Sequence, residues 1–203
     1  MTELGHRGEI PSTQIAEALG ECQIINNNDQ EHLPSMLFDE CNVELFDNVH
    51  PLQWVDPAND QGKYDMLVIG GGAGGLVTAA GSAGVGARVC LIERNFLGGD
   101  CLNTGCVPSK AFLKCANVVH AARTAEDFGI EIEGEITVNF KTVMERMRKI
   151  RAQISENDSA RRFSTTLGVD IYMGNAIKQH NDHIQSTQHS IVRTKCLVSG
   201  RPI

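Results

Sequence analysis

The chain has 203 residues, which is enough for one domain or two small ones with a buried core. With 41% hydrophobic and 21% charged residues, the composition is that of an ordinary soluble protein. No apolar run approaches the roughly 20 residues that a membrane helix needs. The net charge of −7 argues against nucleic acid as a partner.

Charge is unevenly divided along the chain. Residues 1–62 contain 12 acidic residues and a single basic one, whereas residues 63–203 contain 17 basic and 13 acidic residues. This step predicts a boundary near Gly62, between an acidic, partly disordered extension (1–62) and a folded domain (63–203). The start resembles neither a secretory signal nor a transit peptide, and the seven scattered cysteines fit a reducing compartment. The expected localisation is cytoplasmic.

The acidic extension carries one predicted helix, over residues 12–22, which a run of asparagines ends. Residues 33–54 then mix apolar and acidic side chains with prolines between them. Two interpretations compete: an adaptor segment that packs on a partner, or a loosely ordered tail. The low content of apolar residues and the high net charge favour the tail.

From Tyr64 onwards the pattern is that of a βαβ unit. The apolar run at 65–69 predicts a strand buried on both faces of a parallel sheet. A glycine-rich turn (70–75), a small-residue helix (76–82) and a second buried strand (88–93) follow. The fold class expected is therefore α/β.

Two longer helices and several short strands complete the expected elements. The helices span 109–124 and about 140–163, and the apolar positions of the second recur at the helical period after Asn139, a predicted N-cap. Its methionine-rich face is interpreted as core. Beyond Gly168, strands are expected at 169–173, 183–186, 190–192 and 195–198.

The glycine turn matches the phosphate-binding pattern G-x-G-x-x-G at Gly70, Gly72 and Gly75. These glycines allow a tight turn, close approach of a pyrophosphate and close packing of helix on strand. The helix that follows offers free N–H groups to phosphates. Glu93, 18 residues after Gly75, ends the second strand, where its carboxylate can accept hydrogen bonds from a ribose diol and would repel a 2′-phosphate.

Cys101 and Cys106 are the candidate redox centre. Four residues separate them, in the run GGDCLNTGCVPSK from Gly98 to Lys110, and no second pair makes a zinc site. Residues five apart point away from each other on a regular helix, so a disulfide requires a local distortion, for which Gly105 supplies freedom. A helix beginning near Cys106 with Lys110 one turn on would favour the thiolate form. Two unrelated buried thiols are the alternative.

Histidines at 180, 183 and 189 are close enough in sequence to suggest metal binding. They lie in a strand-and-turn region without a helical frame or a thiol partner. We interpret them as solvated loop residues and predict no metal site.

The segment from Lys63 to Lys110 closely resembles the FAD-binding region of the class I pyridine nucleotide–disulfide oxidoreductases. The run GGDCLNTGCVPSK is most similar to a mercuric-reductase-like member, with dihydrolipoamide dehydrogenase close behind. Asp100 stands where the family commonly has threonine. The resemblance implies a Rossmann-like FAD-binding domain, a parallel sheet with crossover helices and a small antiparallel β insert, truncated and preceded by the N-terminal extension.

The same resemblance implies roles for individual residues. Gly70, Gly72 and Gly75 would hold the FAD pyrophosphate and Glu93 the adenosine ribose, and Gly99 would also bind the cofactor. Cys101 would be the interchange thiol facing the substrate, Cys106 the thiolate against the flavin, and Lys110 the residue near flavin N5. Gly174 and Ala176 belong to a Gly-x-Ala element that would contact the adenine, and 196–202 resembles the strand that closes the first half of the FAD domain.

The function implied is electron transfer from NAD(P)H through FAD to the Cys101–Cys106 disulfide, and on to a substrate such as mercuric ion. Oxidation of a lipoyl dithiol is the nearest alternative, and a truncated, non-catalytic FAD-binding or redox module is another. The NAD(P)H domain and the dimerisation domain of the homodimeric family are not encoded here. We therefore expect no turnover by this chain alone, and neither nucleic acid nor a membrane as partner.

Overall fold

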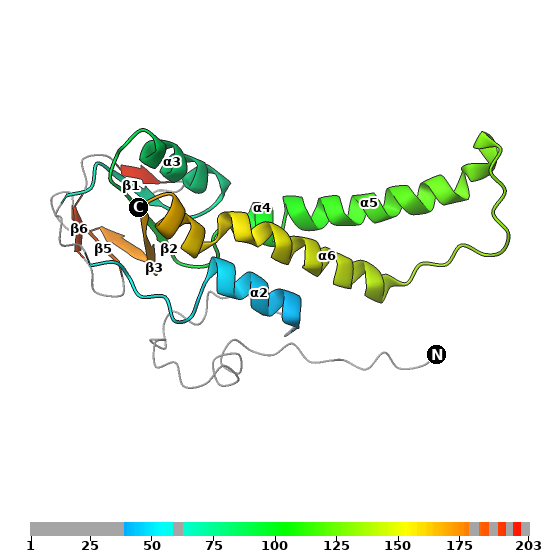
Figure 1. Cartoon of the computed structure of the whole chain (residues 1–203), viewed down its shortest axis with the longest axis horizontal. Helices are drawn as coiled ribbons and strands as arrows, with labels where there is room; N and C mark the ends of the chain where they lie inside the picture. Colours follow the sequence, from blue (N-terminus) through cyan, green and yellow to red (C-terminus); the bar gives the residue numbers. More distant parts are fainter. Residues whose placement is uncertain (1–38, 59–62, 179–182, 187–190, 194–196, 200–203) are drawn as a thin grey trace.

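A four-stranded parallel sheet forms the centre of the structure (Figure 1). The computed structural model describes residues 39–58, 63–178, 183–186, 191–193 and 197–199; the helix predicted at 12–22 lies outside these ranges. The strand order is β3-β2-β1-β7, and each neighbouring pair is parallel. The strands are β1 (Met66–Ile69), β2 (Val89–Glu93), β3 (Val169–Met173) and β7 (Leu197–Ser199).

Three short strands form a separate antiparallel sheet in the order β4-β5-β6. They are β4 (Ala176–Lys178), β5 (His183–Ser186) and β6 (Ile191–Arg193). The Rossmann-like α/β fold expected from the sequence, with its small antiparallel insert, is confirmed.

Strand β2 is buried along its whole length, because apolar clusters cover both faces of the parallel sheet. Alternate residues point to opposite faces, as the strand period requires. Val89 and Leu91 join the main core, which helix α3 (Ala73–Gly84) covers with Leu76 and Ala79. Cys90 and Ile92 join a second cluster on the other face, together with Tyr64, Leu67 and Tyr172.

Helices α4 (Gly99–Asn103), α5 (Cys106–Arg123) and α6 (Phe140–Ser155) follow β2, and α5 and α6 form an arm that projects from the sheet (Figure 1). Asn139 caps α6 as predicted, because its side chain accepts a hydrogen bond from Thr142 N at 3.2 Å. The predicted continuation to residue 163 is wrong. Helix α6 ends at Ser155, and the backbone of Ser159 is extended while its hydroxyl accepts from Arg162 N and begins a new turn (Arg162–Thr166).

The segment 39–58 is part of this fold. Helix α2 (Glu40–Val49) begins at Asp39, whose side chain accepts from Asn42 N at 2.9 Å. Its residues Leu45, Phe46 and Val49 are buried in the main core. Its other face carries the exposed acidic residues Glu40, Glu44 and Asp47.

Residues 54–57 then run beside β3, the edge strand of the parallel sheet. Trp54 Nε1 donates to Ile171 O at 3.0 Å, and Met173 N donates to Asp56 Oδ1 at 3.2 Å. The interpretation of residues 33–54 as a loose tail therefore does not hold for 39–54, and packing continues across the boundary predicted near Gly62. The acidic residues on the exposed face of α2 suggested a loose tail, whereas the apolar residues on its other face are buried in the core.

Asp56 makes this attachment pH-dependent. Burial raises the pKa of its carboxyl to about 6, against the opposing hydrogen bond from Met173 N, and its Oδ2 is buried without a hydrogen-bond partner. The folded state therefore binds the proton more tightly than the unfolded state, so this contribution to stability is present below pH 4 and is lost as pH rises to about 6.

We expect Asp56→Asn to raise the free energy of unfolding at pH 7 by about 1 kcal/mol, a value reduced for the partial exposure of the group. At pH 4 the difference from the unsubstituted chain should be close to zero. Urea unfolding at both pH values measures it, with the exposed Asp47→Asn as control. An equal effect of Asp56→Asn at both pH values would contradict the titration.

Within the described ranges, no helix is both long and apolar enough to cross a membrane.

Candidate functional site

The glycine turn lies at the carboxyl end of β1, the central position at which an open α/β sheet binds ligands. Gly70 adopts φ +100° and its N–H donates to Ile92 O at 2.9 Å. A Cβ on Gly75 would lie 1.8 Å from Gly70 O. The turn therefore tolerates no side chain at Gly75, and a left-handed backbone favours glycine at 70.

Helix α3 begins directly after this turn with an open N-terminus. Gly72 is its N-cap and supplies no side chain, and Ala73 and Gly74 are exposed. A Cβ on Gly74 would meet no atom within 4 Å. N–H groups in the first turn of a helix have no intrahelical acceptor, so this end can receive an anion.

Glu93 lies beside the turn, at the end of β2. Its carboxylate accepts hydrogen bonds from Gly71 N at 2.5 Å and from Asn95 N at 2.6 Å. Gly174, directly after β3, donates its N–H to Glu93 O at 2.8 Å, and the half-buried Ala176 begins β4. The structure thus places Glu93 and Gly174 at the same edge of the sheet as the glycine turn.

The glycine turn and the cysteine run are in direct backbone contact. Gly98 N donates to Gly71 O at 2.8 Å, and Gly98 forms a parallel bridge with Gly72. A Cβ on Gly99 would lie 2.7 Å from Gly72 Cα. The two predicted motifs can approach this closely only because both are bare backbone here.

A break between two helices brings Cys101 and Cys106 together. Cys101 lies in α4, Cys106 is the first residue of α5, and Gly105 between them donates its N–H to Asp100 O at 2.5 Å. The two side chains are hydrogen-bonded as free thiols, with Cys101 half-buried and Cys106 exposed. The local distortion that the sequence spacing requires is therefore present.

Charges around Cys101 oppose one another. The hydrogen bond with Cys106 raises the pKa of the Cys101 thiol most, followed by burial, the charge of Cys106 and the carboxylate of Asp158. Lys110, exposed on α5, acts in the opposite direction. Lys110 lies one turn after Cys106 on α5.

Asp158, Asn103 and Arg151 also belong to this site, and sequence reasoning gave none of them a role. Asn103 is buried and donates from Nδ2 to Leu97 O at 3.1 Å and Gly99 O at 2.8 Å, which fixes α4. Arg151 donates to Asn103 O at 2.8 Å and to Asn42 Oδ1 at 2.5 Å. Asn103 lies inside the cysteine run and could have been noticed there, whereas no local pattern marks Asp158 or Arg151.

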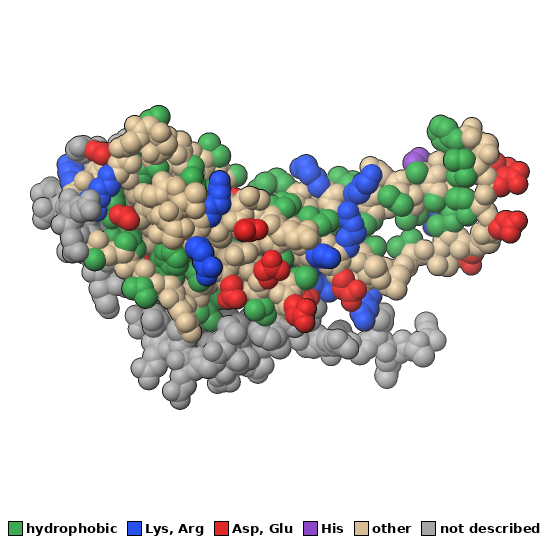
Figure 2. Space-filling model, viewed as in Figure 1, with side chains coloured by type: hydrophobic (Ala, Val, Ile, Leu, Met, Phe, Trp, Pro, Cys, Tyr) green, Lys and Arg blue, Asp and Glu red, His purple; other side chains and the backbone are tan. Residues whose placement is uncertain are grey.

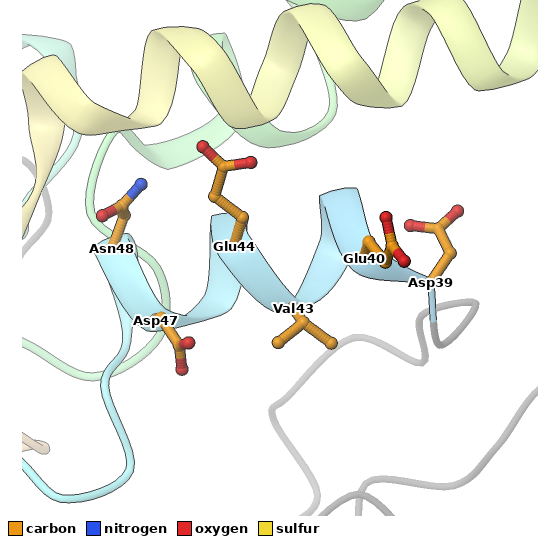
Figure 3. Close-up of a pocket in the computed structure, with 6 residues that line it drawn as sticks. All are labelled: Asp39, Glu40, Val43, Glu44, Asp47 and Asn48. Carbon is orange, nitrogen blue, oxygen red and sulfur yellow. The ribbon is translucent and has the colours of Figure 1, made fainter.

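A cavity of about 580 Å³ lies along α2. Figure 3 shows its side chains projecting from this one helix. It is lined by Asp39, Glu40, Val43, Glu44, Asp47 and Asn48. The cavity does not include the glycine turn or the thiols, so it is not part of the site described here.

No group of three or more metal-binding side chains occurs among the residues that the structure describes. Of the three clustered histidines, His183 lies in β5, while His180 and His189 fall outside the described ranges.

Comparisons with known proteins agree with this geometry. The sequence profile of the family described as pyridine nucleotide-disulphide oxidoreductase matches residues 64–177. The chain is 33% identical over 139 residues to the dihydrolipoyl dehydrogenase of Acholeplasma laidlawii, a match that covers 68% of this chain and 41% of the relative. It is 42% identical over 88 residues to the dihydrolipoyl dehydrogenase of Bacillus subtilis, covering 43% of this chain and 18% of the relative.

The chain thus spans less than half of the length of these relatives. The region that the family profile matches nevertheless includes the glycine turn, Glu93 and the cysteine pair, and ends within β4. This chain belongs to the pyridine nucleotide–disulphide oxidoreductase family.

Proposed function

We propose that this chain supplies the FAD site and the redox dithiol of an enzyme that transfers electrons between a dithiol or disulfide substrate and NAD(P)H. Members of the family use FAD and NAD(P)H. The observation that carries the proposal is the direct contact between the glycine turn and the cysteine run, at Gly72 and Gly99. This contact puts an anion-binding helix end next to a pair of hydrogen-bonded thiols.

The residues present fit FAD. Gly70, Gly72 and Gly75 form a turn without side chains, and the open N-terminus of α3 offers N–H groups to a pyrophosphate. Glu93 would bind the adenosine ribose, whose hydroxyls would donate to carboxylate lone pairs that the bonds from Gly71 N and Asn95 N leave free.

The remaining predicted contacts surround this core of the FAD site. Gly174 and Ala176 would border the adenine, and Gly99 and Lys110 the flavin side of the site. When bound, FAD would accept or donate the electron pair that the nicotinamide exchanges.

Electron exchange with the substrate uses Cys101 and Cys106. In the oxidised protein, a substrate thiolate attacks Cys101 Sγ, the Cys101–Cys106 bond breaks, and Cys106 leaves as a thiolate. The second substrate thiol then loses its proton and attacks the substrate sulfur of the mixed disulfide, which releases Cys101. The substrate has become a disulfide, and the two electrons reside on the cysteine pair.

A lipoyl dithiol is the substrate that we propose. The relatives described above are named dihydrolipoyl dehydrogenase, which favours this substrate over the mercuric ion expected from the cysteine run. A homodimer and an NAD(P)H-binding portion, both implied by the family resemblance, belong to the same proposal.

Two measurements on the purified chain test the proposal. We expect added FAD to bind, with a change in flavin fluorescence, and a mild oxidant to join Cys101 and Cys106 in a disulfide that peptide mass spectrometry identifies. Cys101→Ser and Cys106→Ser should each abolish that disulfide, whereas Cys115→Ser, on the same helix as Cys106, should leave it intact. A chain that binds no FAD and forms no Cys101–Cys106 disulfide would refute the proposal.

A further inference from the structure

We propose that His50 is a positioning residue for the ribose-binding carboxylate: its ring fixes the backbone of Asn95, and the N–H of Asn95 fixes Glu93. This inference rests on the proposed function, because it takes Glu93 as the ribose ligand of FAD. His50 is the C-cap of α2 and lies outside residues 64–177, which the family profile matches. A segment that precedes the matched region therefore takes part in the cofactor site.

The carboxyl end of α2 contacts the connection between β2 and the cysteine run, residues 94–97. His50 Nδ1 is hydrogen-bonded to Asn95 O, and Leu97 N donates to Val49 O at 3.1 Å. Both contacts join residues more than 40 positions apart in the sequence. The connection is therefore held from outside by two neighbouring residues of α2 and its cap.

Aromatic rings surround the contact. The ring centroid of His50 lies 5.5 Å from that of Phe46 and 5.8 Å from that of Phe96, and both pairs meet edge-on. Phe46 and Phe96 belong to the main core, whereas His50 is half-buried. Packing on two core rings restricts the orientation of His50 and keeps its Nδ1 at Asn95 O.

Asn95 connects this contact to the carboxylate. Its N–H donates to Glu93 Oε1 at 2.6 Å, while Glu93 Oε2 accepts from Gly71 N at 2.5 Å. The backbone of Asn95 is thus bonded at its carbonyl by His50 and at its N–H by Glu93. A carboxylate that is fixed before the ribose arrives loses less freedom on binding, so this support favours FAD affinity.

His50 must be the donor in this contact, because a backbone carbonyl only accepts hydrogen bonds. Nδ1 therefore carries a hydrogen. Burial lowers the pKa of His50, against the opposing hydrogen bond with Asn95 O, and so favours the neutral ring. Protonation would add a hydrogen at Nε2 and leave the one on Nδ1 in place, so the contact does not depend on the charge of the ring.

The test is amide hydrogen exchange in the full chain without FAD, followed residue by residue by NMR. We expect His50→Leu to accelerate exchange of the Asn95 and Gly71 N–H groups about three- to ten-fold, because both donate to a carboxylate that has lost its support. His50→Asn places an amide N–H close to the position of Nδ1 and should retain the rates of the unsubstituted chain. Rates in His50→Asn equal to those in His50→Leu would contradict the hydrogen bond.

Two controls separate this local effect from general loosening. The N–H of Gly70 donates to Ile92 O in the same glycine turn and should keep its rate in His50→Leu. Val49→Ala removes buried core volume next to His50 without changing the ring, and it should not accelerate Asn95 relative to Gly70. Equal acceleration at Gly70 and Asn95 in His50→Leu, or no acceleration at Asn95, would overturn the proposal. If His50→Leu does not fold, His50→Met, which is flexible and has no N–H donor, takes its place.

FAD titration, followed by flavin fluorescence, extends the test to the cofactor. We expect His50→Leu to weaken FAD binding about three- to ten-fold in the unsubstituted chain, but less than about two-fold in a chain with Glu93→Gln, because His50 acts through Glu93. Equal losses in both chains would rule out this route. A chain that binds no FAD refutes the proposed function, whereas the exchange rates still decide whether His50 positions Glu93.

Discussion

Gly75→Ala is expected to lower the free energy of unfolding by about 3 kcal/mol, because the new Cβ would overlap backbone that has no room to move. It would lie 1.8 Å from Gly70 O and 3.0 Å from Gly70 C. Relief requires helix α3 to move away from β1, which separates Leu76 from the main core. Chemical unfolding followed by circular dichroism measures the loss.

Gly74→Ala is the matched control, one residue earlier in the same turn of α3. Its Cβ would meet no atom within 4 Å, and the position is helical, so alanine should stabilise the chain by about 0.5–1 kcal/mol. The two substitutions therefore have opposite signs. Similar losses at both positions would show that the close approach of Gly75 to Gly70 does not exist in solution.

The strand–turn–helix part of this fold could be predicted because its signals are local. The apolar runs that become β1 and β2, the glycines between them and Glu93 all lie within 30 residues of sequence. Each has a backbone or burial requirement that its own residue type reveals. The contact between the glycine turn and the cysteine run was not predicted, since it joins Gly72 to Gly98 across 26 residues and no local pattern marks it.

Burial along α6 was harder to predict. Periodicity shows that a helix is amphipathic, but it does not show which of the apolar residues a neighbouring helix covers. Met147 of α6 is buried as expected, yet Phe140, on the same predicted face, is 66% exposed. Phe140 is the first residue of α6, and acidic side chains gather at the far end of the arm in Figure 2. Helix α5 extends past the start of α6 along the arm (Figure 1), and Phe140 is exposed even though a neighbouring helix runs beyond it.

Asp158 and α2 were missed for a common reason: their partners are distant in sequence. The Asp158 carboxylate lies beside Gly98 and Arg151 binds Asn42, and neither residue belongs to a motif. In α2, exposed acids share the helix with three buried apolar residues, and these buried residues determine where the helix packs. Average charge and hydropathy cannot separate two faces of one helix.

Phe46→Ala tests whether α2 is an integral part of the domain. Phe46 is 6% exposed and meets the ring of Phe96 edge-on, with ring centroids 5.5 Å apart. We expect a loss of about 3–4 kcal/mol in the free energy of unfolding, from the buried surface and the cavity that alanine leaves. Asp47→Ala, on the exposed face of the same helix, should change stability by less than about 0.5 kcal/mol.

A domain that begins at residue 63 and a domain that includes α2 predict different outcomes for Phe46→Ala. If the domain began at residue 63, truncating Phe46 would leave the unfolding of the sheet unchanged, and the signals of α2 and the sheet would separate. Because Phe46 packs against Phe96, directly after β2, we expect one transition that shifts as a whole. The loss of stability should also expose the thiols, since Arg151 binds both Asn42 of α2 and Asn103 of α4. Alkylation of Cys101 in Phe46→Ala should therefore accelerate at denaturant concentrations where the unsubstituted chain is still protected.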